Sequence, residues 1–318
     1  ALSRAIKTMK ELDFSRFEST VNPQNLKLAV ISILVLFVVS MNVATGLRSS
    51  EAIRGSPSPS PEIWEDSVDF MQNEAPEGSV VLSWWDYGYL FQTLGRTGSV
   101  ADGGNFGYYT SSGEKINFPL AEYLNGTVEN DTEFIDKHSA DYIWLDHTMI
   151  GKFSAVSQIA NRDNSQFESI IGIETNNLRQ SLSRDGNQTV ATFQGRLGRS
   201  RASMFVPLEI NNRLASIEGS PTARLSNGRS ADINCVLTEN GRKEFDVESD
   251  LPFCLAEDPF YSLERGLVGG SSRVLLVPKK ISDSTFVKLY IQDGYGVPYA
   301  EKVPEASNGY IKMWEITE

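Results

Sequence analysis

The sequence predicts one transmembrane helix followed by a mixed α/β globular domain with a β-rich C-terminal module. Residues 28–47 form an uncharged apolar run, residues 79–183 alternate strand-like and helix-like patterns, and strands predicted beyond residue 188 are separated by glycine-rich turns. Such alternation is typical of layered α/β domains, whereas closely spaced strands with turn residues are typical of all-β modules. With 318 residues, 40% of them hydrophobic, the chain can bury one large core or two smaller ones.

The run from Leu28 to Leu47 is twenty residues long and carries no charge, which is the length needed to cross the hydrocarbon core of a bilayer. A signal peptide fits less well, because the run is too long and begins too far into the chain. A buried helix of a soluble domain is the remaining alternative. We therefore expect a segment at 1–27 on the cytoplasmic side and a transmembrane helix at 28–47.

The charge on the two sides of this helix predicts its orientation. Residues 1–27 hold five basic and three acidic side chains, a net charge of +2, so the remainder must carry −14 to give the overall −12. Because basic flanks stay in the cytoplasm, we expect a single-pass protein of the cell membrane whose C-terminal domain lies on the extracellular face. The amphipathic stretch 5–18 fits either a helix on the cytoplasmic membrane surface or an ordinary loop.

The composition argues against two classes of function. An acidic external domain does not fit nucleic-acid binding, which requires a basic patch to neutralise phosphates. The chain has two histidines and no HExxH motif, so it does not resemble a zinc metalloenzyme. We expect no nucleic-acid partner.

Residues 48–61 are predicted to be a linker, since prolines alternate with serines near its end. Residues 60–62, Ser-Pro-Glu, favour a helix start with proline in the first turn. This helix is predicted to run to about residue 73 and opens a mixed α/β core domain expected over residues 62–187. It should pack through Ile63, Val68 and Met71.

The strand predicted at Ser79–Leu82 ends at the most unusual stretch of the chain, Ser83-Trp84-Trp85-Asp86-Tyr87-Gly88-Tyr89. In α/β folds, ligand sites commonly lie at the C-terminal ends of strands. The indoles of Trp84 and Trp85 can form a stiff-walled pocket, and Asp86 can accept a hydrogen bond from a small hydroxyl inside it. The alternative is that both tryptophans belong to the core and that the aspartate caps a helix.

A second group of candidate residues follows the strand predicted at Ala140–Leu145. On a helix from 146 to 159, which turns about 100° per residue, five side chains fall within an arc of about 140°. They are Asp146, Met149, Lys152, Val156 and Ile159. This face could serve a ligand, or the helix could simply be amphipathic with Lys152 at the boundary of its buried stripe.

The character of the sequence changes near residue 188. Short runs rich in β-branched and aromatic residues favour strands, and the turns between them are rich in glycine. These strands are predicted at 189–193, 203–207, 274–278, 286–291 and 310–316. We therefore expect a β-rich module over residues 188–318.

Two further features concern covalent chemistry outside the membrane. Cys235 and Cys254 could form a disulfide, contributing about 3 kcal/mol, or remain free buried thiols. Asn-x-Thr sequons begin at Asn125, Asn130 and Asn187, which is compatible with an external domain that is itself glycosylated.

The stretch Trp84–Gly88 resembles the WWDYG signature of the oligosaccharyltransferase catalytic subunit, the STT3/AglB family of N-glycosylation enzymes. The surroundings fit as well: a predicted helix with Trp64 precedes the stretch and Ala101–Asn105 follows it. The stretches Lys288–Gly294 and Lys312–Ile316 are similar to the end of archaeal AglB proteins. The chain therefore resembles the C-terminal portion of an archaeal member of this family.

The resemblance implies roles for the residues of the signature. Trp84, Trp85 and Asp86 would form the pocket that recognises the Ser or Thr two residues after the acceptor asparagine. Tyr87 and Gly88 are expected to be structural: the tyrosine would pack beneath the indoles, and the glycine would allow a close approach of two backbone segments.

The family also carries a DK-type motif on a helix near this signature, and Asp146, Met149 and Lys152 resemble it. The final apolar position of the motif falls on Val156 or Ile159, where the spacing departs from the family pattern. The resemblance implies an apolar wall for the methyl group of an acceptor Thr, and one buried methyl group is worth about 0.8 kcal/mol.

The resemblance further implies the reaction: transfer of an oligosaccharide from a lipid-linked donor to the Asn side chain of an Asn-x-Ser/Thr acceptor polypeptide. A divalent metal, Mn or Mg, would stabilise the phosphate leaving group. In the family, the metal ligands lie in a multi-helix membrane domain that this sequence does not match. We therefore expect the metal to bind outside this chain, no catalytic residue within it, and no transfer by this chain alone.

Two other classes of function remain open. A membrane-tethered glycan-binding module would stack Trp84 and Trp85 on sugar faces. An anchored glycoside hydrolase would use two carboxylates, such as Asp86 with Asp102 or Glu114.

Overall fold

The computed structural model describes residues 62–104, 113, 115–128, 132–162, 167–185, 188–197, 200–212, 214–226, 228–249 and 251–317. The chain divides into two compact units, Ala1–Ser60 and Pro61–Glu318, and the described residues belong to the second. The predicted cytoplasmic segment 1–27, transmembrane helix 28–47 and linker 48–61 lie outside the described residues. Among the helices of the described part, none is both long and apolar enough to cross a bilayer.

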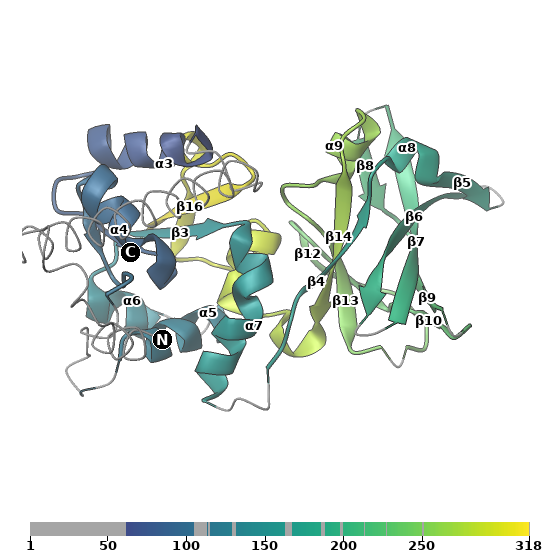
Figure 1. Ribbon diagram of the computed structural model, residues 1–318, viewed down its shortest axis with the longest axis horizontal. Coiled ribbons are helices and arrows are strands. Elements are labelled where there is room, and N and C mark those ends of the chain that lie inside the picture. The colour runs from purple at the N-terminus through teal and green to yellow at the C-terminus, as the bar shows by residue number, and fades with distance from the viewer. Residues whose placement is uncertain are drawn as a thin grey trace, which may run out of the picture. The chain divides into compact units, whose positions relative to one another are not determined.

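The predicted mixed α/β domain is confirmed, and it is built on a five-stranded sheet (Figure 1). In spatial order its strands are β15 (Ala300–Lys302), β16 (Ile311–Ile316), β3 (Tyr142–Asp146), β1 (Val80–Leu82) and β2 (Gly98–Ser99). β1 runs parallel to β2 and β3, whereas β16 runs antiparallel to β3 and β15. Every residue of β3 is buried, as expected for the central strand of a sheet covered on both faces.

Helices cover both faces of this sheet, with α3 on one face and α5, α6 and α7 on the other (Figure 1). The helices are α3 (Glu62–Asn73), α4 (Gly88–Leu90), α5 (Asn117–Asn125), α6 (Thr132–His138) and α7 (Thr148–Asn161), with shorter turns η1 (Trp85–Tyr87), η2 (Phe91–Gly95), η4 (Lys279–Ile281), η5 (Val287–Ile291) and η6 (Pro304–Ala306). The helix predicted at 62–73 is confirmed, and its Val68 and Met71 are buried. α7 begins two residues later than predicted, because Asp146 is the last residue of β3.

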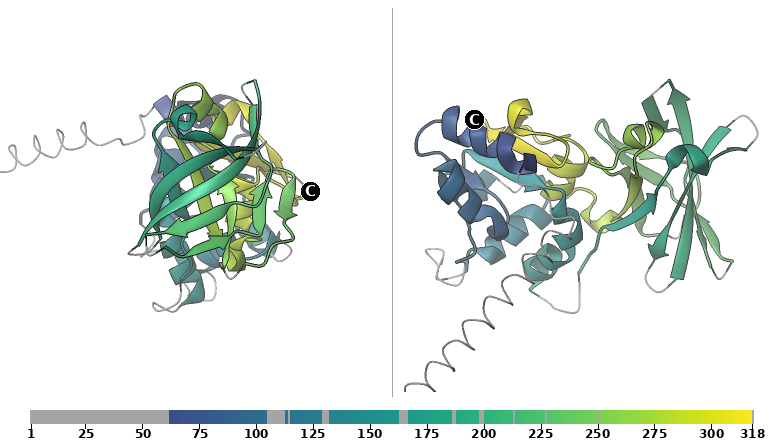
Figure 2. Two further views of the ribbon diagram at one scale, coloured as in Figure 1. Left: turned by 90° about the vertical axis from the view of Figure 1, so that its right-hand side faces the viewer. Right: turned by 45° about the horizontal axis from the view of Figure 1, so that its top comes forward.

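The predicted β-rich character is also confirmed, in an eleven-stranded sheet. Its strands are β10 (Ser230–Asp232), β9 (Thr222–Leu225), β7 (Ser200–Asn211), β6 (Gln188–Leu197), β4 (Ile171–Thr175), β14 (Ser272–Pro278), β13 (Phe253–Glu257), β11 (Cys235–Thr238) and β12 (Gly241–Glu244), with β5 (Leu182–Asp185) beside β6 and β8 (Leu214–Ile217) beside β7. Two short helices, α8 (Leu178–Ser181) and α9 (Leu263–Leu267), accompany it. The left view of Figure 2 shows its teal and green strands facing the viewer. Cys235 and Cys254 form a disulfide between β11 and β13, which run parallel.

The described residues bury two hydrophobic cores, and β11, β13 and β14 contribute to both. In β13, Cys254 and Ala256 belong to the first core, which also contains β3 and α7, whereas Leu255 belongs to the second. Successive side chains of a strand point to opposite faces, so this strand is buried on both sides.

The strand predicted at 286–291 is wrong, because these residues form the helical turn η5 inside the first core. A short run that is apolar on all sides fits a buried helix as well as a strand. Signals at its two ends favour the helix: the Ser284 hydroxyl accepts the N–H of Val287, and Gly294 has a φ of +84°.

Strand pairing also crosses the predicted division at residue 188. β15 and β16 lie in the predicted β-rich module, yet β16 pairs with β3 in the five-stranded sheet. β4 lies in the predicted core domain, yet it pairs with β14 in the larger sheet. Both pairings join segments far apart in the sequence, which hydrophobic periodicity does not report.

Candidate functional site

The WWDYG stretch lies directly after β1, where the chain leaves the sheet in a tight turn. Trp84 has extended backbone angles, and its carbonyl accepts the N–H of Tyr87 at 2.9 Å. Residues 85–87 therefore form the single turn η1, which continues into α4. This turn places Asp86 at the surface and directs Tyr87 into the core.

The two tryptophans differ in their surroundings. The Trp84 side chain is a core residue, whereas Trp85 is half-buried, and their ring centroids are 6.1 Å apart. The indole N–H of Trp85 has no hydrogen-bond partner among the described residues. Among the described residues the indole N–H groups of Trp64, Trp144 and Trp314 are also unpaired, so this feature does not by itself distinguish Trp85.

Gly88 lies in close contact with the backbone after β2. A Cβ at this position would be 2.1 Å from the carbonyl oxygen of Ala101 and 2.5 Å from the Cβ of Asp102. No side chain fits there. Asp102 is itself buried and accepts hydrogen bonds from Gln92 Nε2 and the N–H of Gly104, each at 2.8 Å.

The structure brings Asp86 together with the helix predicted to carry the second group of residues. Lys152 Nζ of α7 is 2.6 Å from Asp86 Oδ2, and the two side chains are 34% and 28% exposed. The same ammonium donates a hydrogen bond to the Tyr87 hydroxyl at 3.0 Å and lies 4.6 Å from the centroid of its ring. Among the described residues, no further ion pair or hydrogen bond reaches the carboxylate of Asp86.

The contacts among Asp86, Lys152 and Tyr87 continue into the core as a hydrogen-bond network on the buried side of Tyr87. The Tyr87 hydroxyl donates to Asp146 Oδ2 at 2.8 Å, and the Thr148 hydroxyl donates to Asp146 Oδ1, also at 2.8 Å. The hydroxyl oxygens of Tyr87 and Thr148 also lie within hydrogen-bonding distance of each other, so the Tyr87 proton can point to Thr148 in place of Asp146. The chain of contacts thus runs from Asp86 through Lys152 and Tyr87 to the fully buried Asp146.

Burial determines the protonation of this network. It raises the pKa of Asp146, while the hydrogen bonds from Tyr87 and Thr148 and the charge of Lys152 act in the opposite direction. Burial, and after it the charge of Asp146, holds the pKa of Tyr87 far above its usual value. The phenol therefore remains protonated, and a hydrogen-bond donor, at any physiological pH.

The apolar residues of the predicted α7 face lie elsewhere. Met149 is 1% exposed and Val156 is fully buried, and both belong to the first core together with Phe153. Ile159 is partly buried against the same core. Of the predicted α7 residues, only Lys152 thus reaches the surface beside Asp86.

Three polar residues near this network, Thr148, His147 and Asp258, were not predicted from the sequence. His147, between Asp146 and Thr148, has Nε2 within 2.9 and 3.0 Å of both carboxylate oxygens of Asp258, at the end of β13. Asp258 is fully buried and also accepts the N–H groups of Phe260 and Tyr261. Thr148 is the first residue of α7, but its hydroxyl does not cap the helix and binds Asp146 instead, so no helix-start signal points to it. The His147–Asp258 pair leaves no local sequence signal.

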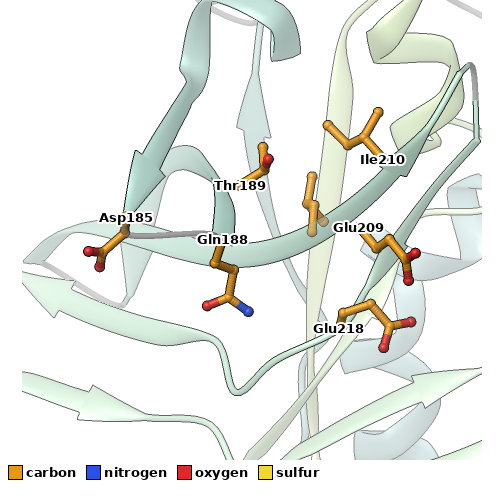
Figure 3. Close-up of a pocket in the computed structure, with 7 residues that line it drawn as sticks. Asp185, Gln188, Thr189, Glu209, Ile210 and Glu218 are labelled. Carbon is orange, nitrogen blue, oxygen red and sulfur yellow. The ribbon is translucent and has the colours of Figure 1, made fainter.

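Other parts of the described chain do not extend the site. A cavity of about 540 Å³ opens on the larger sheet, lined by Asp185, Gln188, Thr189, Leu208, Glu209, Ile210 and Glu218 (Figure 3). None of the motif residues lines it. Among the described residues, no cluster of three or more His, Cys, Asp or Glu side chains could hold a metal ion. Glu114 lies outside the described residues.

No protein-family model matches the chain, but two curated archaeal proteins do. The chain is 28% identical over 160 residues to dolichyl-phosphooligosaccharide-protein glycotransferase 2 of Pyrococcus horikoshii, a match covering 50% of this chain and 19% of that protein. It is 43% identical over 44 residues to dolichyl-phosphooligosaccharide-protein glycotransferase 1 of Pyrococcus furiosus, covering 13% and 5% of the two. The match thus spans about a fifth of the length of the first relative.

Among solved structures, the chain is similar to the C-terminal domain of PglB from C. jejuni. The identity is 12% and the TM-score 0.46, and the match covers 79% of this chain and 98% of that one.

Proposed function

We propose that this chain, related in sequence to the archaeal oligosaccharyltransferases, recognises the acceptor sequon in an enzyme that transfers a lipid-linked oligosaccharide to Asn in Asn-x-Ser/Thr. The observation that carries the proposal is the contact between Lys152 and Asp86, which joins the WWDYG turn to α7. Lys152 occupies Oδ2 of this carboxylate. The other oxygen, Oδ1, has no partner among the described residues and is available to an incoming hydroxyl.

The chemistry of the proposed recognition is hydrogen bonding to one hydroxyl group. A Thr or Ser hydroxyl donates to Asp86 and accepts a hydrogen bond from Lys152, with the half-buried Trp85 as the neighbouring wall of the site. An acceptor with Ala at this position forms neither hydrogen bond, and a hydrogen bond to a charged group is worth about 1.5–3 kcal/mol. Trp84, Met149 and Val156 support the site from the core side, where they fix the turn and α7.

The remaining chemistry belongs to other parts of the enzyme. Transfer to the amide requires the lipid-linked donor and a divalent metal, Mn or Mg, and we propose that both bind outside this chain. The protein would act at the cell membrane, with this domain on the extracellular face and an unfolded acceptor polypeptide as its partner. On this proposal, the described residues select the acceptor and do not themselves catalyse transfer.

The proposal is tested by measuring transfer from a lipid-linked donor to Asn-x-Thr and Asn-x-Ala peptides in membranes that carry the full-length enzyme, including the parts that bind the donor and the metal. We expect transfer to the Asn-x-Thr peptide only, and its loss in the double variant Trp85→Ala, Asp86→Ala. Asp69→Ala, an exposed aspartate of α3, is the matched control and should leave transfer unchanged. Transfer that survives the double variant would show that the sequon is recognised elsewhere.

A further inference from the structure

We infer that the hydroxyl of Tyr87 is a positioning group that holds the Lys152 ammonium against Asp86 and thereby sets how tightly the site binds an acceptor hydroxyl. The inference rests on the proposed function. It gives Tyr87 a role beyond packing, because the oxygen of this side chain contacts both the buried and the surface half of the network.

The direction of each hydrogen bond follows from the chemistry of the partners. A lysine ammonium can only donate, so the Tyr87 oxygen accepts the hydrogen bond from Lys152. The single phenolic proton then points away from Lys152, to Asp146 or to Thr148, which itself donates to Asp146. In either arrangement a lone pair of the tyrosine oxygen faces Lys152.

This arrangement determines where the lysine ammonium lies. Lysine is a compact charge on a flexible four-carbon stem, and a surface lysine loses conformational freedom when it is held in one place. The Tyr87 hydroxyl and ring together bind one side of the ammonium, and Asp86 Oδ2 binds another. With the ammonium fixed on Oδ2, Oδ1 of Asp86 is presented to the acceptor.

The hydroxyl can be removed without removing the ring. The Tyr87 ring packs 4.7 Å from Trp144 and 6.1 Å from Trp64, measured between ring centroids, and phenylalanine retains both contacts. Asp146 retains its hydrogen bond from Thr148 in the variant. Tyr87→Phe therefore tests the hydroxyl group alone.

The experiment measures kcat and KM for an Asn-x-Thr peptide with the full-length, membrane-embedded enzyme that contains this domain. Tyr87→Phe should raise KM about fivefold to tenfold and change kcat by less than about twofold, because the lost contact acts on acceptor binding. Tyr89→Phe, which removes a hydroxyl from a side chain 51% exposed, is the matched control and should change neither. An unchanged KM in a folded Tyr87→Phe protein would overturn the inference.

A double-mutant cycle separates positioning from packing. If Tyr87 acts through Lys152, then Lys152→Met alone raises KM at least as much, and Tyr87→Phe adds nothing in the Lys152→Met background. If the fold increases in KM of the two single variants multiply in the double variant, Tyr87 acts through packing. A normal KM in Lys152→Met would overturn the inference even if Tyr87→Phe failed to fold.

Asp86→Ala separates the two proposals. If it has no effect on KM, the proposed function fails; if it alone raises KM, only the role of Tyr87 fails.

Discussion

Gly88 determines the geometry of the site although it has no side chain to offer. The atoms that a Cβ would meet include the backbone of residues 101 and 102, which cannot rotate away as the end of a flexible side chain could. Any larger residue must therefore displace one of two chain segments. One of these two segments is the turn that carries Asp86 and Tyr87. A single methyl group at position 88 would therefore disturb the contacts of both residues with Lys152.

We predict that Gly88→Ala lowers the free energy of unfolding by about 2–3 kcal/mol, the cost of overpacking, and raises KM for the acceptor peptide. Gly151→Ala is the control, because a Cβ at Gly151 in α7 meets nothing within 4 Å. It should be neutral or stabilise the protein by up to about 1 kcal/mol through helix propensity. Chemical denaturation of both variants checks this; a Gly88→Ala protein as stable as the parent would contradict it.

Single residues also show how far the sequence could predict the site. Trp85 and Asp86 are predicted as site residues from rare residue types at the end of a strand, and Lys152 from the resemblance to the DK-type motif. Their mutual contact, and the hydrogen bonds to Thr148, depend on how β1 and β3 lie in the sheet, which no local pattern encodes. Met149 and Val156, which were predicted to form an apolar wall, lie in the core. The sequence spacing shows that residues share one side of a helix, but it does not show whether that side faces the core or the solvent.

At the scale of elements, prediction succeeded where local signals agreed. The helix at α3 had a proline start and an amphipathic pattern, and β1 and β3 were short apolar runs bounded by turn residues. The turn η5 was predicted as a strand because Val287, Tyr290 and Ile291 favour strands, while burial on all sides removed the periodicity that identifies a helix. The pairing of β16 with β3 is set by packing of distant segments, which the sequence alone does not reveal.

The junction between β13 and α9 predicts a pH dependence of stability. Burial, and after it the carboxylates of Glu264 and Asp258, raises the pKa of Glu257 from its ordinary 4.5 to about 7. The folded protein thus binds this proton more tightly than the unfolded chain, so the free energy of unfolding falls as pH rises from about 4.5 to about 7. Glu257→Gln removes the titration and can still accept the N–H of Leu263.

We expect the stability of Glu257→Gln to exceed that of the parent increasingly over this pH range, by about 1–3 kcal/mol at pH 7.5. Urea denaturation at a series of pH values measures the difference. Glu248→Gln, at an exposed position, is the control and should follow the parent at every pH. Parallel curves for Glu257→Gln and the parent would contradict the prediction.

At the scale of the whole described unit, one covalent bond supports strands that two cores share. The disulfide joins Cys235 of β11 to Cys254 of β13, and both residues are fully buried in the first core. The loop that it closes is short, with a sequence separation of 19, so it restricts the unfolded chain appreciably.

We predict that replacing both cysteines with alanine lowers the free energy of unfolding by about 3 kcal/mol, the value for a loop of this size. Denaturation of the variant and of the parent, with and without a reducing agent, measures this. The reductant should destabilise the parent to a similar degree and leave the variant unaffected. Equal stability of the oxidised parent and the variant would contradict the prediction.

Because β11, β13 and β14 are buried on both faces, they lack the hydration penalty that usually opposes a shift in strand register. In a strand with one solvent-exposed face, a register shift of one residue exposes its apolar side chains to water. The free-energy cost of that exposure favours the correct register. Here both faces are dry, so a slipped strand would exchange one apolar neighbour for another at little cost in hydration. Cys235 and Cys254 occupy opposed positions in the observed alignment, next to the pair Val236 and Leu255. The disulfide therefore fixes the observed alignment of the two strands, which burial alone favours only weakly over alignments shifted by one residue.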